Sequence, residues 1–406
     1  MTQNSGMAAN PEGTREGEET ILTQADACQS HRVFYLVDSF NVGGTEVQAV
    51  ELATRMAARG HRVTLGCLKA QGPLLERLQG SGVNVEEFYP CGGIDSAGGL
   101  YQLFRLTWHL RKSGYEIVHT HDLWSNLLGI PAARLAGVPV IVSSRRDLGH
   151  LDWYQGKRRV WLRRIQNLSQ IVLANATSIR DALVSEDGFS MERVCVIHNG
   201  IDPKKFLCAG NREKLFPQAG VGKLIVLVGN MHSEVKGHSW LIACAPAVIA
   251  EFPSTRFVLV GDGEQRKKYE SAVRHSGVSE NFIFLGHRND VPEILACCDL
   301  AVLPSLAEGL PNAVLEYMAA GLPCVVSSVG GSAELVDDGV TGILIRARDA
   351  NALSCALLKV LGDPTLACRI GNNGRDFVER SFSFEHMVRR VEELYADLMQ
   401  KYARTS

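Results

Sequence analysis

Short apolar runs alternate with longer segments of helical composition along most of the chain. In the first half, the apolar runs cover residues 32–37, 62–68, 116–119, 138–143, 170–174 and 194–198. In the second half, they cover residues 224–228, 256–260, 281–285, 300–303, 324–326 and 342–345. Strands buried on both faces of a parallel sheet read as continuous apolar runs, and they need helical crossovers between them. The alternation therefore predicts an α/β protein with two doubly wound, Rossmann-like parallel sheets.

The stretch 299–328 predicts a ligand site at the edge of the second sheet. Pro311 stands at the first position of a helix, and Gly321 ends that helix. A glycine-containing loop thus leads to a helix N-terminus, where free N–H groups and the helix dipole favour a phosphate. Glu308 in the loop and Glu316 in the helix suit sugar hydroxyls, because carboxylates accept hydrogen bonds. The pattern fits a nucleoside diphosphate sugar, or else an ordinary βαβ unit with two surface glutamates.

The run EGLPNAVLE, followed by AAGLPCVVSSVGGSAELVDDGVTGILI, resembles the signature of the retaining glycosyltransferases of family 4. Glu308 and Glu316 match the two glutamates of that family's E-x7-E motif. The resemblance implies a GT-B fold, with Glu308 holding hydroxyls of the donor sugar and Glu316 holding the ribose hydroxyls. It also implies that the diphosphate lies against the backbone of Gly309, Leu310, Pro311 and Asn312.

Two stretches of the first half resemble further parts of the family pattern. Gly43 and Gly44 precede a helix and permit a close approach of backbone to ligand, although a tight turn is the simpler alternative. The pattern at 45–48 predicts a capping box for that helix. In VHTHD, the resemblance assigns His121 to the reacting sugar, whereas His119 is expected to pack within a strand. A hydrogen-bonded loop histidine is the alternative for either residue.

The loop GNMHSEVKG at 229–237 is expected to supply positive charge to the diphosphate. Lys236 stands at a helix start, where an ammonium group can meet phosphate as a point charge. The resemblance implies an arginine five residues earlier, but this chain has Met231 there. His232 or Arg288 is the expected substitute.

Composition narrows the class of protein. The 406 residues exceed one typical domain, and a net charge of −2 gives no reason to expect nucleic acid. No apolar run is long enough to span a membrane, and the first thirty residues lack the apolar core of a secretory signal.

The eleven cysteines lack zinc or disulfide spacing, which indicates reduced thiols in the cytosol. The basic and aromatic segment 145–164 suits an anionic membrane surface, or is a solvated face.

Together these patterns predict four segments. They are a polar tail (1–30), an acceptor-side domain (31–208), a nucleotide-sugar-binding domain (209–380) and a final helix (381–406) that returns to the first domain. The resemblance implies transfer of a sugar from a nucleoside diphosphate sugar to a glycan, lipid-linked or polysaccharide-precursor acceptor. The predicted catalytic residues are His121, Lys236 and Glu308.

We expect a cytoplasmic protein, peripheral on the inner membrane face, that needs no metal and no other cofactor. Two alternatives remain open. One is a sugar-nucleotide 2-epimerase of the same fold, and the other is a non-catalytic protein that binds a sugar nucleotide.

Overall fold

The computed structural model describes residues 30–147, 156–217, 220 and 222–403. The strands of its first half are β1 (Arg32–Val37), β2 (Arg62–Cys67), β3 (Asn84–Glu87), β4 (Ile117–Thr120), β5 (Val140–Arg145), β6 (Ile171–Ala174) and β7 (Val194–Val196). Those of its second half are β8 (Leu224–Val228), β9 (Arg256–Val260), β10 (Phe282–Gly286), β11 (Leu300–Leu303), β12 (Cys324–Ser327) and β13 (Ile343–Ile345).

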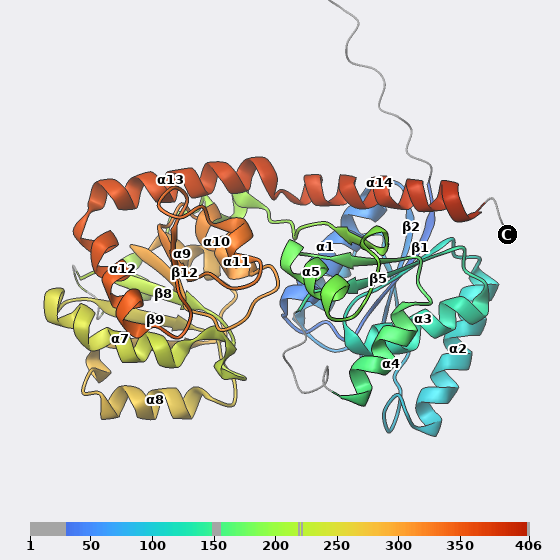
Figure 1. The fold of residues 1–406 in the computed structure, drawn as a ribbon, viewed down its shortest axis with the longest axis horizontal. Coiled ribbons are helices and arrows are strands. Elements are labelled where there is room, and N and C mark those ends of the chain that lie inside the picture. Colours follow the sequence, from blue (N-terminus) through green and yellow to red (C-terminus); the bar gives the residue numbers. More distant parts are fainter. Residues whose placement is uncertain (1–29, 148–155, 218–219, 221, 404–406) are drawn as a thin grey trace, which may run out of the picture.

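The strands form two parallel sheets, which lie side by side along the molecule (Figure 1). The strand orders are β3-β2-β1-β4-β5-β6-β7 and β10-β9-β8-β11-β12-β13. The strand order of the first sheet reverses between β1 and β4, and that of the second sheet reverses between β8 and β11. Such switch points open a crevice at the carboxyl ends of the strands. The predicted doubly wound fold is confirmed. The edge strand β3 was not predicted, because its sequence NVEE lacks an apolar run.

Helices cover both faces of each sheet. The longer helices of the first half are α1 (Gly44–Ala58), α2 (Ala97–Ser113), α3 (Leu123–Ala136), α4 (Lys157–Gln166) and α5 (Thr177–Ser185). The second half contains α6 (Arg212–Leu215), α7 (His238–Glu251), α8 (Arg266–His275), α9 (Val291–Ala296), α10 (Asn312–Ala319), α11 (Ser332–Leu335), α12 (Ala350–Gly362), α13 (Pro364–Ser381) and α14 (Phe384–Tyr402). The short 3₁₀ turns η4 (Pro203–Phe206) and η5 (Glu234–Lys236) precede α6 and α7.

Side chains of β1 alternate between the two faces of the first sheet, and each face has its own hydrophobic core. Val33, Tyr35 and Val37 pack with α1 and α14 on one face of the sheet. Phe34 and Leu36 pack with α2 and α3 on the other face. Because successive side chains of a strand point to opposite faces, one apolar run serves both layers. Figure 1 shows α2, α3 and α4 on the side of this sheet opposite α14.

The start of α1 differs from the prediction. The helix begins at Gly44 with the extended residue Gly43 as its N-cap, and no side chain within the described residues caps it. The predicted capping box at 45–48 is therefore wrong. Thr45 already lies inside the first turn, so its hydroxyl is not placed to accept from the free N–H groups.

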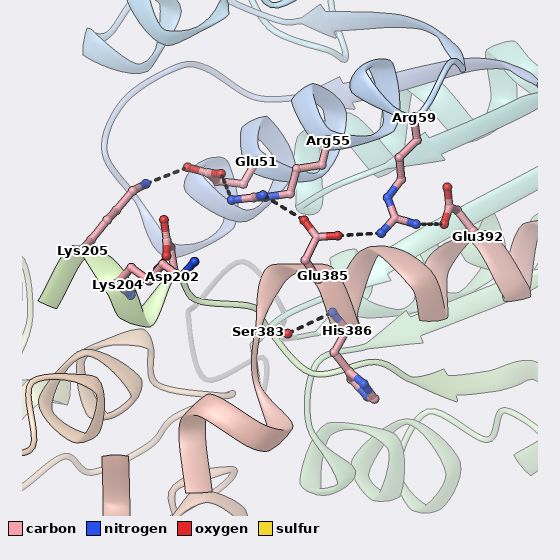
Figure 2. Close-up of polar contacts among 10 residues, drawn as sticks. All are labelled: Glu51, Arg55, Arg59, Asp202, Lys204, Lys205, Ser383, Glu385, His386 and Glu392. Atoms are coloured by element: carbon pink, nitrogen blue, oxygen red, sulfur yellow. Dashed lines mark hydrogen bonds and ion pairs between the residues drawn. The ribbon is translucent and has the colours of Figure 1, made fainter. Parts of the chain in front are cut away.

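The chain leaves the second domain at the end of α13, and the last helix, α14, packs on the first domain (Figure 1). Its contact with α1 is held by ion pairs, which Figure 2 shows. Arg59 lies 2.6 Å from Glu385 and 2.6 Å from Glu392, and Arg55 lies 3.3 Å from Glu385. Glu392 is buried, so its bond to Arg59 compensates for the lost hydration of its carboxylate.

The chain passes between the domains twice, and the two passages touch. The Ile201 N–H donates to the carbonyl of Phe382 at 2.8 Å, and the Phe384 N–H donates to the carbonyl of Ile201 at 3.1 Å. Beside them, Lys205 of η4 reaches Glu51 of α1 at 3.4 Å (Figure 2). None of the helices in the described part of the chain is both long and apolar enough to cross a bilayer.

Candidate active site

A cleft of about 550 Å³ lies between the two sheets, lined by loops from both. The loops after β1, β5, β6 and β7 line it from the first domain, and those after β8, β9, β10 and β11 line it from the second. These loops follow strands at the carboxyl edges of the two sheets, where doubly wound proteins bind ligands. Among the predicted site residues, the lining includes Gly43, Gly44, His232, Lys236, Arg288, Glu308, Gly309, Leu310, Pro311, Asn312 and Glu316.

Lys236 and Glu308 meet inside this cleft. The Lys236 ammonium lies 2.8 and 3.0 Å from the two oxygens of Glu308, and the hydroxyl of Ser305 donates to Glu308 at 2.6 Å. Glu308 is buried, so the paired lysine and the hydroxyl satisfy a carboxylate that would otherwise be costly to bury. Gly237 makes this approach possible, because a Cβ there would collide with the carbonyl oxygen of Pro304.

The N-terminus of α10 faces the same cleft. Its N-cap is Pro311, and no side chain of the described residues caps the helix. The first N–H groups are thus left for a ligand, and the helix dipole favours an anion there. Glu316 lies half-buried one turn into the helix, and burial raises its pKa to about 7. Its carboxyl group is suited to accept hydrogen bonds from ligand hydroxyls.

A chain of hydrogen bonds crosses the floor of the cleft from one domain to the other. Arg146 donates to Asn199 Oδ1 at 2.8 Å, and Asn199 Nδ2 donates to Asn312 Oδ1 at 2.8 Å. Asn312 Nδ2 in turn donates to the carbonyl of Gly44 at 3.3 Å. The backbones also touch, since a Cβ on Gly309 would collide with the carbonyl oxygen of Arg146. Arg146 and Asn199 therefore belong to the site, although the sequence showed Arg146 only within a basic run and Asn199 only as part of a domain crossover.

The loop after β8 presents Asn230 and His232 to the cleft and turns Met231 inward. Met231 is fully buried in the second core, beside Leu227 and Leu241. The position at which an arginine was expected thus does not face the ligand space. The positive groups that do line the cleft are Lys236, Arg288, which pairs with Asp290, and Arg146 from the opposite domain.

His121, predicted to reach the reacting sugar, lies in the core of the first domain. Its ring stacks on His119 with centroids 4.2 Å apart, and both side chains are fully buried. His119 bonds Tyr395 and Ser144 at 2.7 Å each, whereas the ring nitrogens of His121 have no partner among the described residues. Burial, followed by His119 and Arg146, holds the pKa of His121 well below its usual value.

The backbone explains this placement. The N–H of His121 donates to the carbonyl of Leu36 at 2.9 Å, so the pairing of β4 with β1 continues one residue past the strand end. Strand alternation then puts His121 on the same face as His119. His121 is therefore buried and is not among the residues that line the cleft, and its role at the reacting sugar stays a prediction.

Three carboxyl groups of the first domain influence one another, and two of them, Glu46 and Asp122, also interact with Arg146. Burial raises the pKa of Asp38 to about 7, and it also raises the pKa of Glu46. Burial and the charges of Asp38 and Glu46 raise the pKa of Asp122 well above its usual value. Asp122 also has a φ of +72°, which is rare for a residue with a side chain and indicates local strain. The raised pKa values mean that burial favours the protonated forms of these carboxyl groups, none of which is among the residues that line the cleft.

No group of three histidine, cysteine, aspartate or glutamate side chains could hold a metal ion in the part of the chain that the structure describes. The absence of a metal requirement stays a prediction.

Glu334 of α11 links the second domain to α5 of the first. Its carboxylate accepts from the N–H groups of Thr177 and Ser178 at 2.8 and 2.9 Å, and it lies 3.1 Å from His198. Although burial raises its pKa, these hydrogen bonds lower it to about 2. A residue of one domain therefore caps a helix of the other, which holds the two domains together near the cleft.

Comparisons with known proteins agree with this architecture. A family model described as "Glycosyltransferase Family 4" matches residues 42–205, and one described as "Glycosyl transferases group 1" matches residues 222–363. An Escherichia coli protein, UDP-Gal:alpha-D-GlcNAc-diphosphoundecaprenol alpha-1,3-galactosyltransferase, is 31% identical over 350 residues, covering 82% of this chain and 88% of its own. The protein is a glycosyltransferase of family 4.

Other relatives of this family 4 glycosyltransferase include the putative glycosyltransferase EpsF of Bacillus subtilis. It is 30% identical over 337 residues, covering 78% of this chain and 83% of its own. Among solved structures, Anabaena HepE in complex with UDP and glucose superposes with a TM-score of 0.79 at 24% identity. That match covers 90% of this chain and 99% of HepE, and it shows the shared GT-B fold. Membership of family 4 and the GT-B fold, which the sequence resemblance implied, are confirmed, whereas the retaining mechanism and the roles of the two glutamates stay predictions.

Proposed function

We propose that this glycosyltransferase moves a hexose from a UDP-sugar to a hydroxyl group of a lipid-linked saccharide, with retention of anomeric configuration. The observation that carries the proposal is the cleft itself, where the Lys236–Glu308 pair and Glu316 surround the open N-terminus of α10. The names of two similar proteins supply the ligand class. One acts on a saccharide linked to diphosphoundecaprenol, and the other binds UDP and glucose.

The second domain would hold the donor. In this proposal the diphosphate lies against the N–H groups at the start of α10 and beside Lys236. Glu316 accepts hydrogen bonds from the ribose, and Glu308 accepts them from the sugar. The loop at 229–237 has the buried Met231 where an arginine was expected. Arg146, which lines the cleft from the first domain, would supply the missing positive charge.

The chemical step breaks the bond between the sugar C1 and the β-phosphate oxygen. A bond forms from C1 to the acceptor oxygen on the same face, and a leaving-phosphate oxygen takes the acceptor proton. Negative charge grows on the β-phosphate as the bond breaks, so Lys236 and the helix N-terminus stabilise that state more than the ground state.

A product assay tests the proposal. The enzyme is incubated with UDP-galactose, UDP-glucose or UDP-N-acetylglucosamine and a short-chain polyprenyl diphosphate N-acetylglucosamine. Mass spectrometry detects the disaccharide lipid, and NMR of its new glycosidic proton reports the anomer. We expect an α-linked product that is lost in Glu308→Gln and kept in Glu379→Gln, the same change at an exposed position of α13.

An inverted anomer would overturn the retaining mechanism, and absence of any product would overturn the acceptor class. The same donors without acceptor test the epimerase alternative, since epimerisation needs none. Activity that EDTA abolishes and manganese restores would overturn metal independence.

A further inference from the structure

The outer face of α2 is apolar and aromatic, although it faces solvent. Leu100, Tyr101, Phe104 and Trp108 are exposed to between 54% and 64% of their surface. Their spacing of one, three and four residues puts them on one side of the helix. The opposite side packs into the core through Leu106 and Leu110, so this exposure does not reflect a poorly seated helix. An apolar stripe of this size on a folded surface indicates a binding face.

Basic residues flank this stripe. Arg111 and Lys112 are exposed in the last turn of α2, and the Lys112 ammonium lies 4.7 Å from the centre of the Trp108 ring. We call Leu100, Tyr101, Phe104, Trp108, Arg111 and Lys112 the α2 face. Its composition combines large rings with cations and includes no acidic residue.

The neighbouring helices carry the same combination. α3 contacts both α2 and α4, and the three helices cover one side of the first sheet (Figure 1). None of the three contains an aspartate or a glutamate, although the whole chain has 44 acidic and 42 basic residues. On α4, Val160 and Trp161 are exposed by 49% and 60%, and Arg164 lies 5.6 Å from the Trp161 ring. Segment 145–164 thus contributes α4 to this side, while residues 148–155 lie outside the described residues.

We propose that the α2 face, together with the exposed side of α4, docks on the surface of an anionic lipid bilayer. Tryptophan, tyrosine and phenylalanine partition to the headgroup region, and neighbouring lysine and arginine are attracted to anionic lipids. A second copy of this chain would bring like charges together across a symmetric contact, which disfavours self-association through this face. The partner with the complementary chemistry is a negatively charged, partly apolar surface.

Flotation of the full-length enzyme with lipid vesicles tests this docking. We expect binding to vesicles of phosphatidylcholine and phosphatidylglycerol, and much weaker binding to phosphatidylcholine alone. Phe104→Ser with Trp108→Ser should lower the partition coefficient by about tenfold or more. Arg111→Gln with Lys112→Gln should lower it by about tenfold at low ionic strength and less in high salt.

Matched controls keep the result specific. Leu207→Ser and Lys267→Gln make the same kinds of change at exposed positions of the crossover and of α8, and they should leave vesicle binding unchanged. Titration with UDP serves as the folding control, because α2 does not line the cleft among the residues described. The docking proposal does not depend on the proposed acceptor, so vesicle binding and product formation can fail separately.

Two results would overturn the proposal. One is an enzyme that fails to bind anionic vesicles, or that binds them equally well after the paired α2 substitutions. The other is an enzyme that is dimeric in sedimentation and becomes monomeric on Phe104→Ser with Trp108→Ser, which would assign the face to a second copy.

Discussion

Lys236 and Glu308, which are 72 residues apart in the chain, form an ion pair at 2.8 Å in the interdomain cleft. Because the ammonium and the carboxylate neutralise each other, removing either group changes the electrostatic environment of the other. A diphosphate that attracts Lys236 would share it with Glu308, and a sugar hydroxyl would donate to the carboxylate.

We predict a non-additive effect of substitutions in this pair. Lys236→Met removes a preorganised positive group and leaves the Glu308 carboxylate buried and unpaired, so kcat should fall by about 10²–10³-fold. The double variant Lys236→Met with Glu308→Gln should lose much less than the product of the two single losses, because it leaves no lone charge. Steady-state kinetics of the four proteins measures this coupling. Independent, multiplicative losses would contradict a functional pair.

Neighbouring positions in the loop after β8 should respond in opposite ways to an introduced arginine. Asn230 lines the cleft, so Asn230→Arg should strengthen UDP binding by about tenfold, through a charge-assisted hydrogen bond to phosphate. Met231 is fully buried, so Met231→Arg should destabilise the protein by about 3 kcal/mol or more. Calorimetric titration and urea unfolding separate the two effects. Tighter UDP binding by the Met231 variant would show that this position can face the ligand.

Glu316 should make stability depend on pH in a way that a glutamine removes. Its pKa of about 7 in the folded protein lies above the ordinary value of 4.5, so the folded state holds this proton more tightly than the unfolded chain. The contribution of this proton to the free energy of unfolding is fully present below about pH 4.5, and it is lost as pH rises through 7. Glu316→Gln should therefore stabilise the protein at pH 8, by about 2 kcal/mol, and change it little at pH 5.

The same substitution should weaken UDP binding by at least about tenfold, because the ribose loses a charged acceptor. Thermal unfolding between pH 5 and pH 8, with and without UDP, tests both parts. Asp38 is unchanged in the variant, so its titration cancels in the comparison. A variant that is no more stable than the wild-type protein at pH 8, and that binds UDP as tightly, would contradict the assignment.

Glu334 should couple the two domains. Glu334→Ala removes the acceptor for the N–H groups of Thr177 and Ser178, and loss of such a cap costs about 0.5–2 kcal/mol. We expect faster hydrogen exchange at those two amides and a lower kcat/KM. Glu379→Ala, at an exposed site of the second domain, is the matched control. Unchanged exchange at 177–178 would show that the cap does not persist in solution.

Tyr395 should anchor α14 through the first core. Its hydroxyl lies 2.7 Å from His119 Nδ1, and both residues are buried. Tyr395→Phe leaves a polar ring atom without that partner, which should destabilise the first domain by about 1–3 kcal/mol. Urea unfolding of this variant is compared with that of Tyr89→Phe, which changes an exposed tyrosine. Equal stability of the two variants would mean that His119 finds another partner.

Much of the site could be predicted because its parts are local in sequence. Glu308, Pro311 and Glu316 belong to one loop and the helix that follows, so spacing alone sets their relation to the helix N-terminus. Lys236 could be added because its loop follows a strand of the same parallel sheet, and such loops meet at one edge. The boundaries of most strands followed from apolar runs, which buried parallel strands require.

Other residues depended on contacts that no local pattern records. His121 faces the core because the backbone pairing of β4 continues one residue past the end of the strand. Since successive side chains of a strand point to opposite faces, this single extra residue determines the side that His121 faces. Arg146 joins the cleft through a hydrogen bond to Asn199, which is 53 positions away in the chain. Glu334 caps a helix of the other domain.

The sequence by itself determined the alternating architecture, the family and the loop that precedes α10, because periodicity and short spacings are set by the local geometry of strands and helices. Only the tertiary structure decided which polar groups the first domain presents to the cleft, which expected residues it buries, and that α2 turns its aromatic residues to solvent. Those outcomes depend on which elements pack against each other, and packing joins residues that are distant along the chain.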